Sequence, residues 1–398
     1  MAGGCGAPNP SRDLSRGLAR TPPMGWNSWN TFKDGVSDTL LRQVADAMAA
    51  NGMRDAGYRY INMDDGWALP QRLNGHLQPN PAKFPNGFKP LSDYLYARGF
   101  KFGIYADRGT RTCVGLCPGS YGHETTDAKD FADWGVDYVK YDNCNPAFFS
   151  NQAGDYSRMR DALFATGRPI VFSLCAWEFK NWMPGMGQLW RTTADISDNW
   201  GRVLENLDAN ERTAALAGPG NWNDPDMLVV GCEDVADFQH GQVFSDMPEL
   251  AGHPGLTQTE SRSHFSMWAM MAAPLLAGND VIHMPKWIKE ILVNPEVIAV
   301  DQDPAGHQGV AVWENGKGLY VYSKVLQGVN ARAVALFNRM DKDETITAEW
   351  TDLGIPKGQA SVRDIWKHAD LGVFSDRYKG FVSPHEAVLL RIVSVKPE

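Results

Sequence analysis

The sequence predicts an α/β protein in which a (β/α)8 barrel is followed by a C-terminal antiparallel β-domain. Over the first three-quarters of the chain, amphipathic helical stretches that end in Gly alternate with short apolar, β-rich runs. The ends of these runs recur at intervals of roughly 33–41 residues, the length of a strand and crossover helix in a parallel sheet. Beyond Pro304 the pattern changes to period-2 runs separated by turn signals, which indicates a second, antiparallel unit.

Four units with this pattern follow one another in the barrel region. The first has an apolar helical stripe over residues 40–48, which begins behind Ser37 and ends at Gly52, and a strand over 58–63. The next three pairs are helix 91–98 with strand 100–105, helix 126–134 with strand 136–141, and helix 155–166 with strand 170–174.

The C-terminal unit begins with a hairpin over 310–314 and 319–323, which turns at Asn315-Gly316. Further strands are expected over 331–337, 345–350, 361–366 and 387–392. We expect three segments: an N-terminal extension over 1–17, disordered; the barrel over 18–305; and the β-domain over 306–398. The β-domain is interpreted as a structural appendage that packs on the barrel, in preference to a separate sugar-binding module.

Composition narrows the class of ligand. The chain has 398 residues, 43% of them hydrophobic and 21% charged, as in ordinary folded proteins. The 38 Lys and Arg against 47 Asp and Glu leave a net charge of −9, which disfavours nucleic acids and anionic membranes as partners. No apolar run reaches the roughly 18–20 residues of a membrane span, and the first residues lack the apolar stretch of a signal peptide. We therefore expect a protein without a membrane-spanning segment, whose export signal has been removed or never existed.

Polar residues gather where the predicted strands end, as expected if the chemistry lies on one face of a barrel. They are Asp64, Asp65, Tyr105, Asp107, Lys140, Asp142, Trp177, Arg191, Asp195, Asp224 and Asp226. A doubly wound nucleotide-binding sheet would need a Gly-rich turn after its first strand, and the acidic Met63-Asp64-Asp65-Gly66-Trp67 stands there instead.

These carboxylates suit two kinds of hydrolase. Two of them could flank a glycosidic bond, one as nucleophile and one as acid and base, while the others bind sugar hydroxyls. Alternatively they could bind a divalent metal that activates water. The chain has no H-x-H at a strand end and no H-E-x-x-H, and its cysteines lack the spacing of a zinc site, so the glycosidase is favoured and no metal or other cofactor is expected.

Tryptophan supports a sugar site. The chain has 14, and those expected beside the site loops could stack on the apolar face of a sugar ring: Trp26, Trp29, Trp67, Trp177, Trp200 and Trp222. Lys140 and Asp142 share one face of their strand, so both should point into the barrel, where the cation would keep the carboxylate ionised. A structural ion pair is the alternative there, and also for Arg191 and Asp195.

Six segments together resemble glycoside hydrolase family 27, the α-galactosidases and α-N-acetylgalactosaminidases of the melibiase clan. In family order they are residues 21–29 (TPPMGWNSW), 63–67 (MDDGW), 103–107 (GIYAD), 140–144 (KYDNC), 191–196 (RTTADI) and 222–227 (WNDPDM). The resemblance runs from about residue 18 into the C-terminal unit. It implies a (β/α)8 barrel with a C-terminal β-sandwich and an exo-acting, retaining double displacement that needs no cofactor.

The resemblance also implies residue roles. Asp142 is similar to the family's nucleophile and Asp195 to its acid/base. Asp64 and Asp65 match acceptors for O4 and O6, Lys140 a donor to O3 and O4, and Arg191 a donor near O2. The other residues that match the family's substrate-binding positions are Trp26, Tyr105, Cys175, Trp177, Asp226 and Met227.

Two departures from the family pattern bear on the site. Family members commonly have Cys-Glu-Trp or Cys-Ser-Trp where this chain has Cys175-Ala176-Trp177, so the usual Glu acceptor for O2 is missing and Glu178 is one candidate to replace it. Lys33 and Gly66 replace cysteines that are often paired in the family, whereas Cys113 and Cys144 match a family disulfide, which we therefore predict. No partners are assigned to Cys5, Cys117, Cys175 and Cys232.

The favoured function is an α-galactosidase acting on terminal α-linked D-galactose. An α-N-acetylgalactosaminidase is the alternative, because the small Ala176 leaves room for an acetamido group. A β-L-arabinopyranosidase and a non-catalytic galactose-binding protein are less favoured. A disulfide in an enzyme that trims oligosaccharides favours a secreted or periplasmic location over the cytoplasm. The linkage, the aglycone and the oligomeric state are not predicted.

Overall fold

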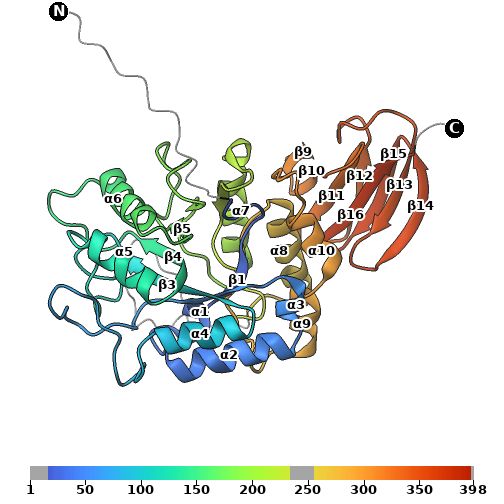
Figure 1. The fold of residues 1–398 in the computed structure, drawn as a ribbon. Helices are drawn as coiled ribbons and strands as arrows, with labels where there is room; N and C mark the ends of the chain where they lie inside the picture. The colour runs from blue at the N-terminus through green and yellow to red at the C-terminus, as the bar shows by residue number, and fades with distance from the viewer. Residues whose placement is uncertain (1–16, 234–254, 396–398) are drawn as a thin grey trace, which may run out of the picture.

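The computed structural model describes residues 17–233 and 255–395, so that the predicted extension over 1–17 lies outside the described residues except for Gly17. A barrel with its helices lies beside a C-terminal β-domain, drawn in orange and red in Figure 1. Helix α8 (Gln258–Met270) lies where the two meet, and ten of its thirteen residues are buried.

Parallel strands form the barrel in the order β7-β6-β5-β4-β3-β2-β1-β8. They are β1 (Met24–Asn27), β2 (Tyr60–Met63), β3 (Lys101–Asp107), β4 (Val136–Asp142), β5 (Val171–Leu174), β6 (Leu189–Arg191), β7 (Trp222–Asp224) and β8 (Leu275–Ala277). The barrel closes just beyond β7, where Leu228 pairs with Ala277 and its N–H donates to the carbonyl of Leu276 over 2.8 Å. The predicted (β/α)8 barrel is confirmed.

The remaining helices of the barrel are short and capped locally. They are α1 (Trp29–Phe32), α2 (Asp38–Ala50), α3 (Met53–Ala56), α4 (Lys89–Ala97), α5 (Glu124–Asp133), α6 (Gln152–Ala165), α7 (Trp200–Glu211), the 3-10 turn η1 (Ala214–Leu216), α9 (Lys286–Leu292) and α10 (Pro295–Asp301). Ser37 caps α2 by accepting from the N–H of Leu40, and Thr257 and Glu260 form a capping box on α8. These caps fix where each helix begins and so how long the preceding loop is.

One glycine shows how tightly the barrel interior is filled. A Cβ at Gly103 of β3 would lie 1.8 Å from Oδ1 of Asn62 on the neighbouring strand β2. Because Asn62 occupies that space, only glycine fits opposite it. The barrel is therefore packed with side chains below its upper face, and the site must lie above this layer.

The β-domain contains a six-stranded sheet, in the order β14-β13-β16-β11-β10-β9, and a two-stranded sheet of β12 and β15. The strands are β9 (Val310–Glu314), β10 (Leu319–Val325), β11 (Ala331–Asn338), β12 (Glu344–Glu349), β13 (Gln359–Asp364), β14 (Ala369–Ser375), β15 (Arg377–Val382) and β16 (Ala387–Ser394). All neighbouring strands are antiparallel, as predicted. Strands β14 and β15 were not expected from the sequence.

The central strand β11 of the six-stranded sheet is buried on both faces. On β11, Val334 and Leu336 pack with Ile346 of the two-stranded sheet, whereas Ala335 and Phe337 belong to the core shared with the barrel. Hydrogen bonds join the same face to α8: Nε1 of Trp366 donates to Oγ of Ser266 over 2.8 Å, and Oγ of Ser263 donates to the carbonyl of His385 over 2.7 Å. The β-domain thus packs against the barrel through both apolar and polar contacts.

Among the described residues, none of the helices combines the length and apolar character needed to cross a membrane.

Candidate active site

Barrel strands place the predicted site residues at one end of the sheet. Asp142 is the last residue of β4 and Asp224 the last of β7, while Asp64 directly follows β2 and Asp195 lies four residues after Arg191 at the end of β6. Because the strands are parallel, their carboxyl ends open onto the same face of the barrel. A cavity of about 20 Å3, enough for one water molecule, lies among Lys140, Cys175, Arg191, Asp224, Asp226 and Met227. The site residues of β4, β5, β6 and β7 therefore converge.

Lys140 and Asp64 form the first polar pair of the site. Nζ of Lys140 donates to Oδ2 of Asp64 over 2.8 Å, and Nδ2 of Asn27 at the end of β1 donates to the same oxygen over 2.8 Å. Asp64 Oδ1 accepts from the N–H of Asp65 over 3.0 Å. Three strands thus fix the Asp64 carboxylate, and its ion pair with Lys140 lies inside the site.

Arg191 is the second polar centre. Its Nη2 lies 3.0 Å from Oδ1 of Asp195 and 3.1 Å from Oδ2 of Asp226, and its Nη1 lies 3.4 Å from Sγ of Cys175. The guanidinium is buried, whereas the side chain of Asp195 is 36% exposed. Arg191 and Asp195 therefore form an ion pair, and Arg191 lines the same cavity as Lys140 and Asp226.

Asp226 holds Arg191 in place. Both of its carboxylate oxygens accept backbone N–H groups, Oδ1 from Met227 and Oδ2 from Ile196, each over 2.8 Å. Its backbone has φ 81°, in the left-handed region that aspartate tolerates better than most residues. The carboxylate is therefore turned back onto the loop after β6, where it orients Arg191 and the segment that carries Asp195.

Asp142 is buried, and burial raises the pKa of its carboxyl to about 6. The charge of Lys140 opposes that rise, and Asp195 adds to it. Its Oδ1 accepts from the N–H of Asn143 over 2.8 Å. Burial likewise raises the pKa of Asp65 and of Asp224 to about 6. Several carboxyls thus share a poorly hydrated site with few cations, an arrangement that is common in catalytic centres.

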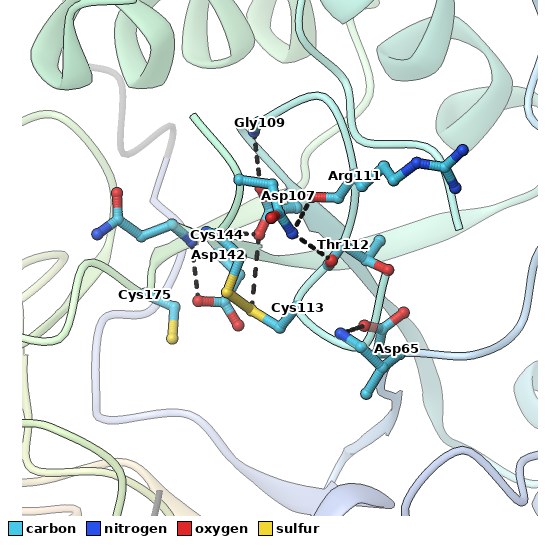
Figure 2. Close-up of a disulfide and its surroundings, with 12 residues drawn as sticks. Asp65, Asp107, Gly109, Arg111, Thr112, Cys113, Asp142, Cys144 and Cys175 are labelled. Carbon is cyan, nitrogen blue, oxygen red and sulfur yellow. Dashed lines mark hydrogen bonds between the residues drawn. A yellow bond between two sulfur atoms is a disulfide. The ribbon is translucent and has the colours of Figure 1, made fainter. Parts of the chain in front are cut away.

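The predicted disulfide between Cys113 and Cys144 is present. It joins the loop after β3 to the loop after β4, and Figure 2 shows it beside the carboxylates of Asp107 and Asp142. The N–H of Val114, next to Cys113, donates to Oδ2 of Asp65 over 3.2 Å, and the N–H of Cys113 donates to the hydroxyl of Tyr105 over 3.4 Å. The bridged loops therefore help to position Asp65 and Tyr105.

The other cysteines form no disulfide among the described residues. Cys117, Cys175 and Cys232 are free and buried, and Cys5 lies outside the described residues.

The same cluster does not suit a metal ion. Ligand atoms of Asp107, Cys113, Asp142 and Cys144 all lie within 4.8 Å of one another. However, the two sulfur atoms are bonded to each other, and the Asp107 carboxylate accepts backbone N–H groups from Gly109 over 2.6 Å and from Cys144 over 2.9 Å. The donor set is thus already occupied by bonds within the protein.

Only some of the tryptophans expected beside the site loops lie there. Trp26 is fully buried at the end of the barrel that carries the site, with Nε1 donating to the carbonyl of Asn279 over 2.9 Å. Trp177 is half-buried and has φ 64°.

Three other tryptophans lie away from the site. Trp222 begins β7 and therefore lies at the opposite end of the barrel, where its Nε1 donates to the carbonyl of Ala19. Trp200 stacks on His385 of the β-domain, and Trp67 packs edge-on against Phe88 and Trp134. These three tryptophans contribute to core packing, because large aromatic rings also fill the spaces between packed helices and sheets.

Glu178 does not replace the missing acceptor at position 176. Its side chain is exposed and pairs with Lys180 at the surface. Asn27, which binds Asp64, was not expected from the sequence. Asp107 and Asp224 were expected at the strand ends but were given no role there. A signal for Asn27 existed, because it lies inside the first segment that matches the family.

A closed barrel with clustered, partly neutralised carboxylates at the carboxyl ends of its strands defines the protein as a glycoside hydrolase. Residues 21–303 match the family model described as alpha galactosidase A, and residues 316–392 match the alpha galactosidase C-terminal beta sandwich domain. The chain therefore belongs to the alpha-galactosidase family, glycoside hydrolase family 27.

Relatives from plants, animals and fungi agree with this. An alpha-galactosidase of Oryza sativa subsp. japonica is 44% identical over 380 residues, covering 94% of this chain and 85% of its own. Alpha-galactosidase A of Homo sapiens is 39% identical over 355 residues, covering 83% and 77%. The crystal structure of alpha-galactosidase I from Mortierella vinacea superposes with a TM-score of 0.84 at 34% identity, covering 94% of this chain and 98% of its own.

Proposed function

We propose that the protein is an exo-acting, retaining α-galactosidase that removes terminal α-linked D-galactose from oligosaccharides or glycoconjugates. The observation that carries the proposal is the contrast between Asp142, buried beside Lys140, and Asp195, half-exposed and held by Arg191. A nucleophile must stay ionised inside the pocket, whereas an acid/base must reach the leaving group and then water.

The reaction follows from these positions. A carboxylate oxygen of Asp142 attacks the anomeric carbon while Asp195 donates its proton to the glycosidic oxygen, so that the glycosidic bond breaks and a galactosyl ester of Asp142 forms. Asp195, now ionised, then takes a proton from water, and the resulting hydroxide attacks the anomeric carbon and releases Asp142. Two inversions leave galactose with its original configuration.

Sugar selection would rest on Asp64, Asp65 and Lys140. Each carboxylate oxygen of Asp64 already accepts from the protein, but a carboxylate has about four acceptor sites, so it can also accept from sugar hydroxyls. Acceptors placed for an axial O4 would remain unpaired with a glucoside, and an unpaired buried polar group costs about 1–3 kcal/mol.

Position 176 supports a second candidate function. Ala176 is small and buried, and Glu178 is paired with Lys180 at the surface, so Glu178 does not replace the usual Glu acceptor for O2. This arrangement suits a 2-acetamido group, and with it an α-N-acetylgalactosaminidase. The names of the relatives favour galactose, which is why the α-galactosidase comes first.

One comparison tests both candidates: kcat/KM on 4-nitrophenyl α-galactoside against its 2-acetamido-2-deoxy analogue. A ratio far above one supports the α-galactosidase, and a ratio below one supports the acetamido alternative. Activity on neither substrate would overturn both. Asp142→Asn, which keeps the size of the side chain, should abolish turnover in either case while the protein remains folded.

A further inference from the structure

Among the large apolar residues of the described chain, Phe148 and Phe149 are the most exposed, at 93% and 89%. Their rings contact each other edge-on, with centroids 4.7 Å apart. They lie in the loop between β4 and α6, and β4 ends in Asp142. Two adjacent phenylalanines in water gain nothing for the fold, so the pair calls for a function outside the core.

The loop that carries them is anchored at its base. The buried Arg108 donates from Nε to Oδ1 of Asn143 and from Nη1 to Oγ of Ser150, which ties the two ends of the loop together. Nδ2 of Asn145 donates to the carbonyl of Thr112 over 2.9 Å, and Cys144 is bridged to Cys113. The two rings therefore project from a loop whose base is fixed, which lowers the entropic cost of binding a ligand there.

The loop lies on the face of the barrel where the pocket opens. It leaves the carboxyl end of β4, so it belongs to the face of the barrel on which the site opens. Phe148 follows Asp142 by six positions, so their Cα atoms lie within about 20 Å of each other, the span of a few sugar rings. The cavity among Lys140, Cys175 and Arg191 has room for only one water molecule, so a bound sugar and anything attached to it must lie above this cavity, on the same face.

The chemistry of the loop fits a neutral sugar chain. Residues 143–154 include no Asp, Glu, Lys, Arg or His, and asparagines at 143, 145 and 151 flank the two rings. Flat aromatic rings pack against the C–H faces of sugar rings, and amides bind their hydroxyls. Two side chains are far too little surface for a stable contact between copies of this chain, which needs about 1,000 Å2, and the net charge of −9 opposes an anionic membrane.

We propose that Phe148 and Phe149 form a binding platform for the aglycone, the second and further sugars of a neutral oligosaccharide or polysaccharide whose terminal galactose occupies the pocket. This rests on the proposed function, because it assigns the remainder of the same substrate. The platform would let the enzyme favour a galactosylated polymer over a short galactoside.

The test compares two substrates that differ in their aglycone. Methyl α-galactopyranoside offers only a methyl group beyond the galactose, whereas galactomannan offers a chain of neutral sugars. In Phe148→Ala/Phe149→Ala, kcat/KM on galactomannan should fall about tenfold, chiefly through KM, because the apolar contact is lost. On methyl α-galactopyranoside it should stay within about twofold, because that substrate does not reach the platform.

Two further variants test whether the effect depends on these two aromatic rings. Phe381→Ala removes another exposed phenylalanine, 63% exposed on β15 of the β-domain, and should change neither substrate. Phe148→Tyr/Phe149→Tyr keeps both rings and should retain the activity on galactomannan. Unchanged activity of the double alanine variant on galactomannan would overturn the platform, as would an equal loss on both substrates.

The activity of the wild-type protein distinguishes a failure of the platform from a failure of the proposed α-galactosidase activity. A wild-type protein that cleaves neither substrate would refute the α-galactosidase itself. A wild-type protein that cleaves both, with a double alanine variant that loses only its binding to phosphatidylcholine vesicles, would leave the α-galactosidase intact and assign the pair to a lipid surface instead.

Discussion

Nζ of Lys140 donates to Oδ2 of Asp64 over 2.8 Å. The cation that was expected to keep Asp142 ionised is therefore hydrogen-bonded to a different carboxylate. It still acts on Asp142 through space, because its charge holds down a pKa that burial raises to about 6. Lys140 therefore couples sugar recognition at Asp64 to the ionisation of the proposed nucleophile. Losing it should affect both binding and the pH dependence of the reaction.

The pH profile of kcat/KM should report this coupling. Asp142 is active when ionised, so the rate should fall as the pH drops through about 6, where its carboxyl takes up a proton. In Lys140→Met the carboxylate loses its nearest favourable charge, so this acidic limb should move upward by about one pH unit. Lys101→Met, at the opposite end of the barrel on β3, should leave the limb unchanged. An unmoved limb in Lys140→Met would show that another group controls it.

Asp142→Asn should make the folded protein more stable at pH 8. The carboxyl has a pKa of about 6 when folded and about 3.8 when unfolded, so between these values the folded state binds more protons, and the free energy of unfolding falls as the pH rises. The neutral amide removes this cost of about 3 kcal/mol. The gain should appear as a higher unfolding temperature at pH 8 and shrink towards pH 4.

Asp195→Asn is the matched control, since it neutralises a side chain that is 36% exposed and should bring no comparable gain. An Asp142→Asn protein that unfolds at a lower temperature than the wild type at pH 8 would contradict the idea that burial of this charge destabilises the fold. Activity on nitrophenyl α-galactoside should fall about 10^4-fold in the same variant.

Exhaustive chelation should leave kcat/KM unchanged. The nearest set of potential metal ligands pairs Asp107 and Asp142 with two sulfur atoms that form the disulfide, and the oxygens of Asp107 accept from backbone N–H groups. The measurement is activity after prolonged dialysis against EDTA. A loss that added divalent cation reverses would support the metal-dependent hydrolase that the sequence left as an alternative.

The sequence was most informative where the periodic pattern is long. Strands β2 to β5 and the helices before them were predicted to within a few residues, because each shows several repeats of its period. Strands β6, β7 and β8 have only three residues each, too few for any period to show, and β14 and β15 alternate too weakly around Gly and charged residues. For the short barrel strands, the polar motifs at their ends were a better signal than the strands themselves.

Site geometry was harder to predict than site composition. The strand-end aspartates and Arg191 were identified, but the spacing of Arg191 and Asp195 could not reveal that Asp226 shares the same guanidinium. That contact depends on a left-handed backbone at Asp226, which no sequence period encodes. Trp222 was misplaced for a related reason, because the short strand that ends at Asp224 begins at Trp222 and so places this side chain at the opposite end of the barrel.

The disulfide should matter for sugar binding as well as for stability. It closes a loop of 31 residues, which corresponds to about 3–4 kcal/mol in the unfolded-chain entropy model. It also holds the segment whose N–H groups bind Asp65 and Tyr105. In Cys113→Ala/Cys144→Ala we therefore expect a lower unfolding temperature together with a KM on nitrophenyl α-galactoside that rises about tenfold, since Asp65 and Tyr105 lose their fixed positions.

Cys117→Ala provides the comparison, because Cys117 lies in the same loop, is buried and has no bridge. It removes one sulfur atom without opening the loop, so KM should stay near that of the wild type. KM should be measured well below the unfolding temperature of each variant, so that loss of folded protein does not enter it. If the double variant kept the wild-type KM while its unfolding temperature fell, the disulfide would stabilise the barrel without positioning the residues of the pocket. Asp65 would then be held chiefly by the N–H of Gly66, which donates to its Oδ1 over 2.7 Å.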